Sequence, residues 1–88
     1  YTLVFDNISV DEMHDINSYL ATFKGYEHHR TIEAMMLHHE VWYETSIDSA
    51  RLTRNLQKML EHLGIKGRVV YPHGRAGVYG IEKLPTAN

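Results

Sequence analysis

Two helix-start signals restrict the fold of this 88-residue chain more than any other feature. Ser9-Val10-Asp11-Glu12 has the S-x-x-E form of a capping box, in which serine and glutamate each bond the other's backbone N–H. Asp48 is a second N-cap candidate. Apolar residues at helical spacing follow each signal: Met13, Ile16, Leu20 and Phe23 after the first, and Leu52, Leu56, Met59, Leu60 and Leu63 after the second. The sequence therefore predicts two amphipathic helices, the first ending near Lys24-Gly25 and the second at Gly64.

Strand-like segments lie before and after these helices. Residues 1–5 are rich in β-branched and aromatic side chains, and so are residues 68–71 and 77–81. The last two segments are separated by Pro72-His73-Gly74-Arg75-Ala76, which has the composition of a turn. We therefore expect a first strand at the start of the chain and a hairpin at its end.

Residues 26–46 fit two structures. Apolar and polar residues alternate in the second half, around the β-preferring Val41-Trp42-Tyr43, and this favours two antiparallel strands. The strands would cover 27–34 and 38–45 and turn near Met35-Met36. Good helix formers around that turn leave a helix as the alternative.

With the hairpin, the order of elements is β-α-β-β-α-β-β. This order resembles the split βαβ, or ferredoxin-like, arrangement with one added strand. The resemblance implies an α+β fold in which two helices pack on one face of an antiparallel sheet. We expect a single domain over residues 1–84, followed by a tail at 85–88. The chain begins with Tyr1, and we interpret it as a piece of a longer protein.

Composition excludes several kinds of protein. The absence of cysteine excludes disulfides, thiolate nucleophiles and cysteine-based zinc sites, and leaves the compartment undetermined. No apolar run reaches the ~18–20 residues that a membrane-spanning helix needs.

A bacterial origin is an impression of sequence style that no individual residue supports.

The charges are unevenly distributed. Residues 1–48 hold nine acidic and two basic residues, whereas residues 49–88 hold seven basic and two acidic ones. The acidic first helix could pack beside the second helix and neutralise it. Alternatively, Arg51, Arg54 and Lys58, which share one helical stripe, form a docking surface for an acidic partner.

Seven histidines raise the question of a metal site. A turn at Met35-Met36 places His29 opposite Trp42 and His38 opposite Glu33, which leaves the two histidines several residues apart along the sheet. Zinc needs three or four converging ligands, so we expect no metal and no cofactor. No G-x-S-x-G motif holds a serine on a strained turn, and we expect no catalytic residues.

The first strand offers one further resemblance. Leu3-Val4-Phe5-Asp6-Asn7-Ile8 resembles the shorter signature of RNA-recognition-motif domains, which stack bases on aromatic residues of their central strands. This implies a base-stacking role for Trp42. The chain departs from the family at Val4, where the family has an aromatic residue, and at Glu40 and Glu44, where basic residues belong.

We therefore predict a non-catalytic interaction or assembly module of a larger protein. It would bind a protein partner through the open sheet face or through the basic helix stripe, and it could also form a homo-oligomer. The alternatives are a domain that binds RNA or single-stranded nucleic acid, which we consider less favoured, and a regulatory domain that binds a small ligand. The candidate contact residues are His29, Glu40 and Trp42 on the sheet and Arg51, Arg54 and Lys58 on the helix.

Overall fold

Strands and helices follow one another in the expected order. They are β1 (Thr2–Asp6), α1 (Val10–Leu20), β2 (Tyr26–Ala34), β3 (His38–Thr45), α2 (Ser49–His62), β4 (Gly67–Val70) and β5 (Val78–Lys83). The computed structural model describes residues 1–85. The hairpin expected over the middle of the chain is confirmed and the helical alternative is wrong. Most of the expected tail, residues 86–88, lies outside the described residues.

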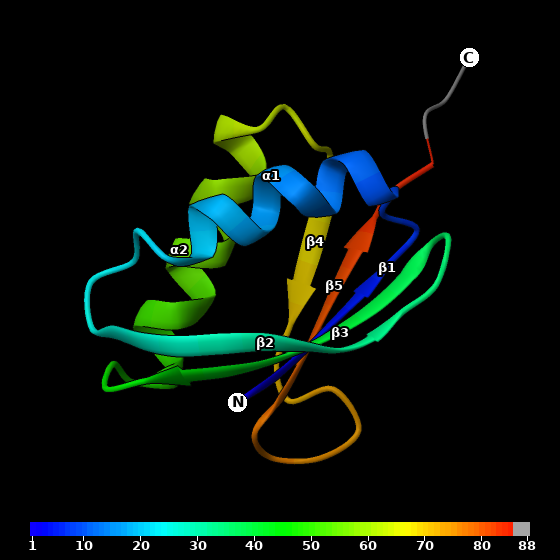
Figure 1. Ribbon diagram of the computed structural model, residues 1–88. Coiled ribbons are helices and arrows are strands. Elements are labelled where there is room, and N and C mark those ends of the chain that lie inside the picture. Colours follow the sequence, from blue (N-terminus) through cyan, green and yellow to red (C-terminus); the bar gives the residue numbers. More distant parts are fainter. Residues whose placement is uncertain (86–88) are drawn as a thin grey trace.

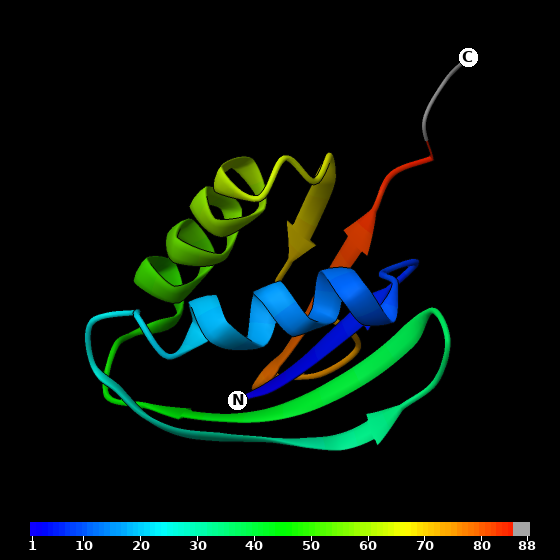
Figure 2. The same ribbon diagram turned by 45° about the horizontal axis from the view of Figure 1, so that its top comes forward.

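The five strands form one sheet in the order β2-β3-β1-β5-β4. Both helices lie on the same face of this sheet, and within residues 1–85 no helix covers its other face (Figures 1 and 2). The fold is therefore α+β with two helices on one side, as expected.

The prediction of a purely antiparallel sheet is wrong, because β1 pairs with β5 in parallel. After α2 the chain does not return to the position beside β1. It forms the edge strand β4 and turns back, so that β5 fills the space between and runs in the direction of β1. Burial explains this order: residues 78–81 of β5 are all buried, whereas β4 alternates between half-buried and exposed positions. The more apolar strand takes the inner position.

Both predicted helix starts are confirmed. The Glu12 N–H donates to Ser9 Oγ at 3.1 Å and the Ser9 N–H donates to Glu12 Oε1 at 2.9 Å. Asp48 accepts a bond from the Arg51 N–H at 2.8 Å. α2 ends as expected, because Gly64 has a φ of 70° and the next residue bonds back to α2. α1 ends at Leu20, which is several residues before the predicted end.

The core lies between the helices and the sheet. Alternate residues of the inner strands face it: Leu3 and Phe5 of β1, His39, Val41 and Tyr43 of β3, and Tyr79 and Ile81 of β5. His39 is 2% exposed and is therefore a core histidine, and its Nε2 lies 2.9 Å from the carbonyl oxygen of Ile8. The residues between these ones in sequence face the other side of the sheet, which we call the open face.

Candidate functional site

The register of the β2–β3 hairpin decides which side chains reach the open face. Two bulges interrupt the pairing, one between Tyr26 and His28 and one between Thr31 and Glu33. Each bulge adds one unpaired residue to β2 and so shifts the pairing by one position. As a result, Trp42 pairs with Arg30 rather than with His29.

His29 therefore does not lie on the open face, contrary to the sequence prediction. It pairs with Tyr43, which faces the core. Its Nδ1 is 2.9 Å from the hydroxyl oxygen of Tyr26, and its ring lies beside that of Tyr43. Burial, with a smaller contribution from His28, lowers the pKa of His29. His29 is thus a packing residue at the edge of the core and does not accompany Glu40 and Trp42.

Trp42 lies on the open face as predicted, and 38% of it is exposed. The guanidinium carbon of Arg30 is 5.8 Å from the centroid of the Trp42 ring, which is a cation–π distance. The ring of His28 approaches the Trp42 ring edge-on at 6.1 Å. Arg30 and His28 are the neighbours that the sequence prediction missed, because a bulge cannot be located from alternation alone.

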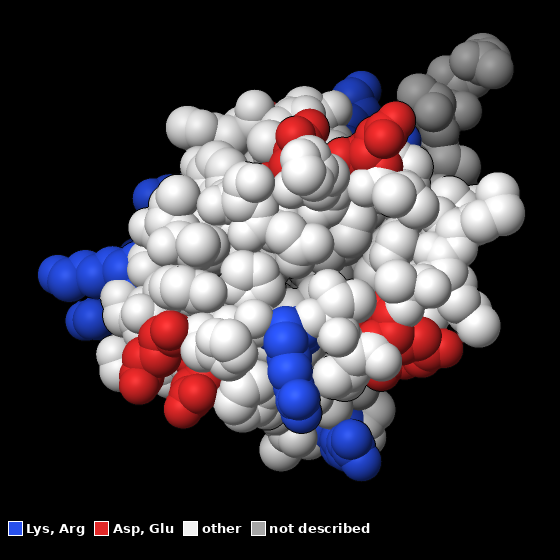
Figure 3. Space-filling model, viewed as in Figure 1, with Lys and Arg blue, Asp and Glu red and all other residues white. Residues whose placement is uncertain are grey.

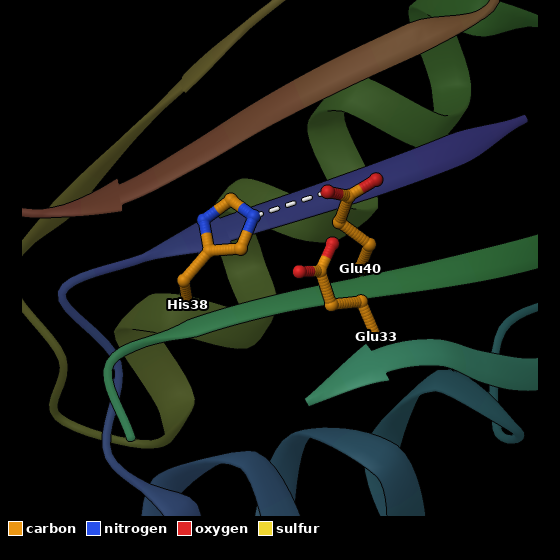
Figure 4. A group of neighbouring side chains, drawn as sticks. All are labelled: Glu33, His38 and Glu40. Carbon is orange, nitrogen blue, oxygen red and sulfur yellow. Dashed lines mark hydrogen bonds and ion pairs between the residues drawn. The ribbon is translucent and has the colours of Figure 1, made fainter. Parts of the chain in front are cut away.

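A group of one histidine and three acids occupies the part of the open face nearest the β2–β3 turn. His38 Nδ1 is 2.6 Å from Asp6 Oδ1, and His38 Nε2 is 3.1 Å from Glu40 Oε2. Glu33, His38 and Glu40 each offer a ligand atom within 4.8 Å of the others, and their polar ends point toward one another (Figure 4). We call Asp6, Glu33, His38 and Glu40 the His38 cluster.

Hydrogen bonds set the ionisation in this cluster. Those with Asp6 and Glu40 raise the pKa of His38, which favours the imidazolium form. The bond with His38, followed by one with Glu33, lowers the pKa of Glu40. Glu40, predicted as a contact residue, is therefore held in place by the cluster.

The end of the hairpin is apolar and exposed. The exposed fractions are 50% for Ile32, 59% for Met35, 84% for Met36 and 52% for Leu37, and we call these four residues the hairpin tip. The backbone of the tip is fixed, because the Met35 N–H donates to the His38 carbonyl at 2.8 Å. The Leu37 carbonyl also accepts a bond of 2.7 Å from the backbone N–H of Asn7.

The predicted basic stripe is present on α2, where Arg51, Arg54 and Lys58 are all exposed. The only ion pair that reaches the stripe within residues 1–85 is the local one between Arg51 and Asp48, at 3.8 Å. The acids of α1 thus form no ion pair with the stripe in this part of the chain. In the view of Figure 3, an uncharged area lies between α1 and β2 and extends toward the hairpin turn, with charged side chains above and below it.

Two surface hollows are the places where a small ligand would bind if the domain were a regulatory, ligand-binding one. A surface groove of about 840 Å³ lies along α2 and β4, between residues such as Leu60, Ile65 and Val69. A smaller hollow of about 170 Å³ lies on the open face beside Asp6 and His73.

Comparison with models of protein families, with curated proteins and with solved structures gives no match for this chain. The structure thus identifies a small α+β domain and no specific family. None of the helices within residues 1–85 has the length and the apolar composition needed to cross a membrane.

Proposed function

We propose that this domain is a non-catalytic interaction module that docks onto a protein partner through the hairpin tip. The observation that carries the proposal is the concentration of exposed apolar side chains there. Four of the eight large hydrophobic residues exposed within residues 1–85 lie between positions 32 and 37. Apolar residues scattered singly over a surface need no explanation, but a contiguous exposed patch is typical of an interaction site.

Two properties of the hairpin tip favour contact with another protein. Met35 and Met36 have flexible, polarizable side chains that adapt to an apolar pocket of another protein. Backbone hydrogen bonds to β3 and to Asn7 restrict the conformations open to the tip. Less conformational entropy is therefore lost when a partner binds.

The charges beside the tip define the partner further. Asp6, Glu33 and Glu40 lie next to it on the open face, and His38 is the only base paired with any of them within residues 1–85. A partner with complementary charge would carry basic side chains around its apolar pocket. The proposed partner is thus a protein with an apolar pocket and a basic margin.

Site-specific photocrosslinking tests which surface makes contact. A benzophenone amino acid would replace Met36, Glu44 or Lys58 in turn, so that the tip, the open face and the basic stripe are compared in the cells that make the protein. We expect one discrete adduct with a second protein from position 36 only. An adduct from position 44 or 58 alone would contradict the proposal. An adduct of twice the domain's mass would show that the tip binds a second copy of this domain and not a different protein.

RNA binding is a second candidate because Arg30 and His28 flank an exposed Trp42. A base could stack on the indole ring, and a guanidinium group could contact a phosphate. However, Arg30 already covers the ring, and Glu33, Glu40 and Glu44 on the same face would repel a phosphate backbone. A backbone-amide NMR titration with a short single-stranded RNA tests this. Shifts around Trp42 that persist at physiological salt would favour RNA over a protein partner.

The ferredoxin-like comparison remains part of this proposal, because it rests on the order of the first six elements alone. The origin of the protein in bacteria, its larger parent and the role of Arg51, Arg54 and Lys58 also remain predictions.

A further inference from the structure

We propose that Glu33, His38 and Glu40 bind a divalent transition-metal ion of the Zn²⁺ class, with Asp6 positioning the histidine. This inference does not depend on the hairpin tip, although the same acids also flank the proposed docking surface.

The geometry suits one ion between three ligands. His38 Nε2 and Glu40 Oε2 are 3.1 Å apart. Two ligands on a tetrahedral Zn²⁺ at about 2.0–2.1 Å from the metal are separated by about 3.3 Å. Glu33 offers an oxygen within 4.8 Å of both atoms, and its carboxylate points toward the same space (Figure 4). A small rotation of an exposed side chain would complete the set.

The second nitrogen of His38 is already oriented as in a metal site. Its Nδ1 bonds Asp6 at 2.6 Å, and these two residues lie directly opposite each other on β1 and β3. A histidine that binds a metal through one nitrogen usually donates the other N–H to a carboxylate, which fixes the ring and its tautomer. Asp6 thus directs Nε2 toward Glu33 and Glu40, and a metal ion bound there would displace the Nε2 proton that the imidazolium form shares with Glu40.

Electrostatics also favour a cation at this position. Glu33 and Glu40 are direct cross-strand partners, and like charges in that position repel. No lysine or arginine forms an ion pair with either carboxylate within residues 1–85. His38 alone offsets two or three negative charges, whereas a divalent ion would balance them.

The donor set indicates which ion fits. One imidazole nitrogen with two carboxylate oxygens suits Zn²⁺, Co²⁺ or Mn²⁺, whereas Cu(I) prefers sulfur ligands and Mg²⁺ prefers oxygen alone. His38 and Glu40 remain 34% and 29% exposed at their side chains, so water would complete the coordination. Such an open site holds its metal less tightly than a closed structural one.

Calorimetric titration of the folded domain with ZnCl₂ at pH 7 tests the proposal, with MgCl₂ as the comparison ion. We expect one Zn²⁺ per chain and little heat from Mg²⁺. His38→Gln and Glu40→Gln should each weaken binding at least tenfold, and Asp6→Asn should weaken it by about 10–100-fold through the ring it positions. Imidazole ¹⁵N shifts should show the metal on Nε2 of His38, a signature that a merely structural role would not produce.

His28→Gln is the matched control, because His28 lies on the same face outside the cluster, and it should change the affinity less than twofold. Glu33→Gln alters an exposed side chain, should also weaken binding, and keeps the test valid if another variant unfolds. Absence of saturable Zn²⁺ binding would overturn the proposal, as would binding that survives His38→Gln and disappears with His28→Gln.

Discussion

Gly25 packs so closely against Ile47 that a Cβ atom added to Gly25 would lie 2.6 Å from Ile47 Cγ2. Gly25 also has a φ of 86°, in the left-handed region that other residues avoid. The link from α1 to the hairpin therefore depends on this glycine for both its conformation and its space.

The first prediction compares Gly25→Ala with Gly74→Ala. Gly74 has a similar φ of 83°, but a Cβ there would meet no atom within 4 Å. Backbone strain alone should cost Gly74→Ala about 1–2 kcal/mol. Gly25→Ala should lose about 1–3 kcal/mol more, because the added methyl group also overpacks the site. Urea unfolding of both variants measures the difference in the free energy of unfolding. Equal losses would show that the Ile47 side chain can move aside without a loss of stability.

Tyr43 provides the second prediction. Its buried hydroxyl donates a 2.8 Å bond to the carbonyl of Leu20, the last residue of α1. Burial raises the pKa of this hydroxyl, so it stays protonated and remains a donor. Tyr43→Phe leaves that carbonyl with only the long 3.5 Å bond from the Phe23 N–H, and it should lower the free energy of unfolding by about 0.5–1.5 kcal/mol. The half-buried Tyr19 is the control, and Tyr19→Phe should lose clearly less stability in the same denaturant experiment.

Glu12 gives a prediction about pH. Burial acts to raise the pKa of its carboxyl, but bonds from Ser9 and Lys83 outweigh burial and hold the pKa below its usual 4.5. Since the folded-state pKa is the lower one, this contribution to stability is present above about pH 4.5 and is lost as the pH falls through the folded-state pKa. Glu12→Gln keeps an oxygen for Ser9 but removes the charge that attracts Lys83, 2.9 Å away.

Wild type should therefore be more stable than Glu12→Gln at pH 7, by about 0.5 kcal/mol for a half-exposed pair. The difference in stability between the two proteins should narrow as the pH falls below about 4.5, so it should be smaller at pH 3 than at pH 7. Chemical denaturation of both proteins at the two pH values measures it. Glu61→Gln, on the exposed side of α2, is the control. A difference in stability that is the same at pH 3 and pH 7 would mean that the charge of Glu12 plays no part.

Local features were predictable from the sequence because they depend on neighbours along the chain. The Ser9–Glu12 box, the Asp48 cap and the Gly64 helix end each require only a few adjacent residues. The alternation from His38 to Thr45 likewise indicated which residues of β3 face the core. Element order follows from such signals.

The sheet pairing was not predictable in the same way. The parallel contact between β1 and β5 joins segments over 70 positions apart, and it is decided by which strand buries more apolar surface. The two bulges in β2 were equally invisible, because either one reverses the alternation without leaving a local signal. This is why His29 was placed on the wrong face. Glu33 lies on the same face as His38, as expected, but it pairs with Glu40 and not with His38.

Competition for the crosslink at Met36 tests the docking function most directly. Excess unlabelled domain should abolish the adduct formed at the hairpin tip. Lys58→Ser, which removes one charge of the basic stripe, should compete as well as wild type because the stripe has no part in the proposed docking. The double variant Met35→Ser/Met36→Ser, folded by circular dichroism, should fail to compete. If it competes as well as wild type, the hairpin tip is not the docking surface.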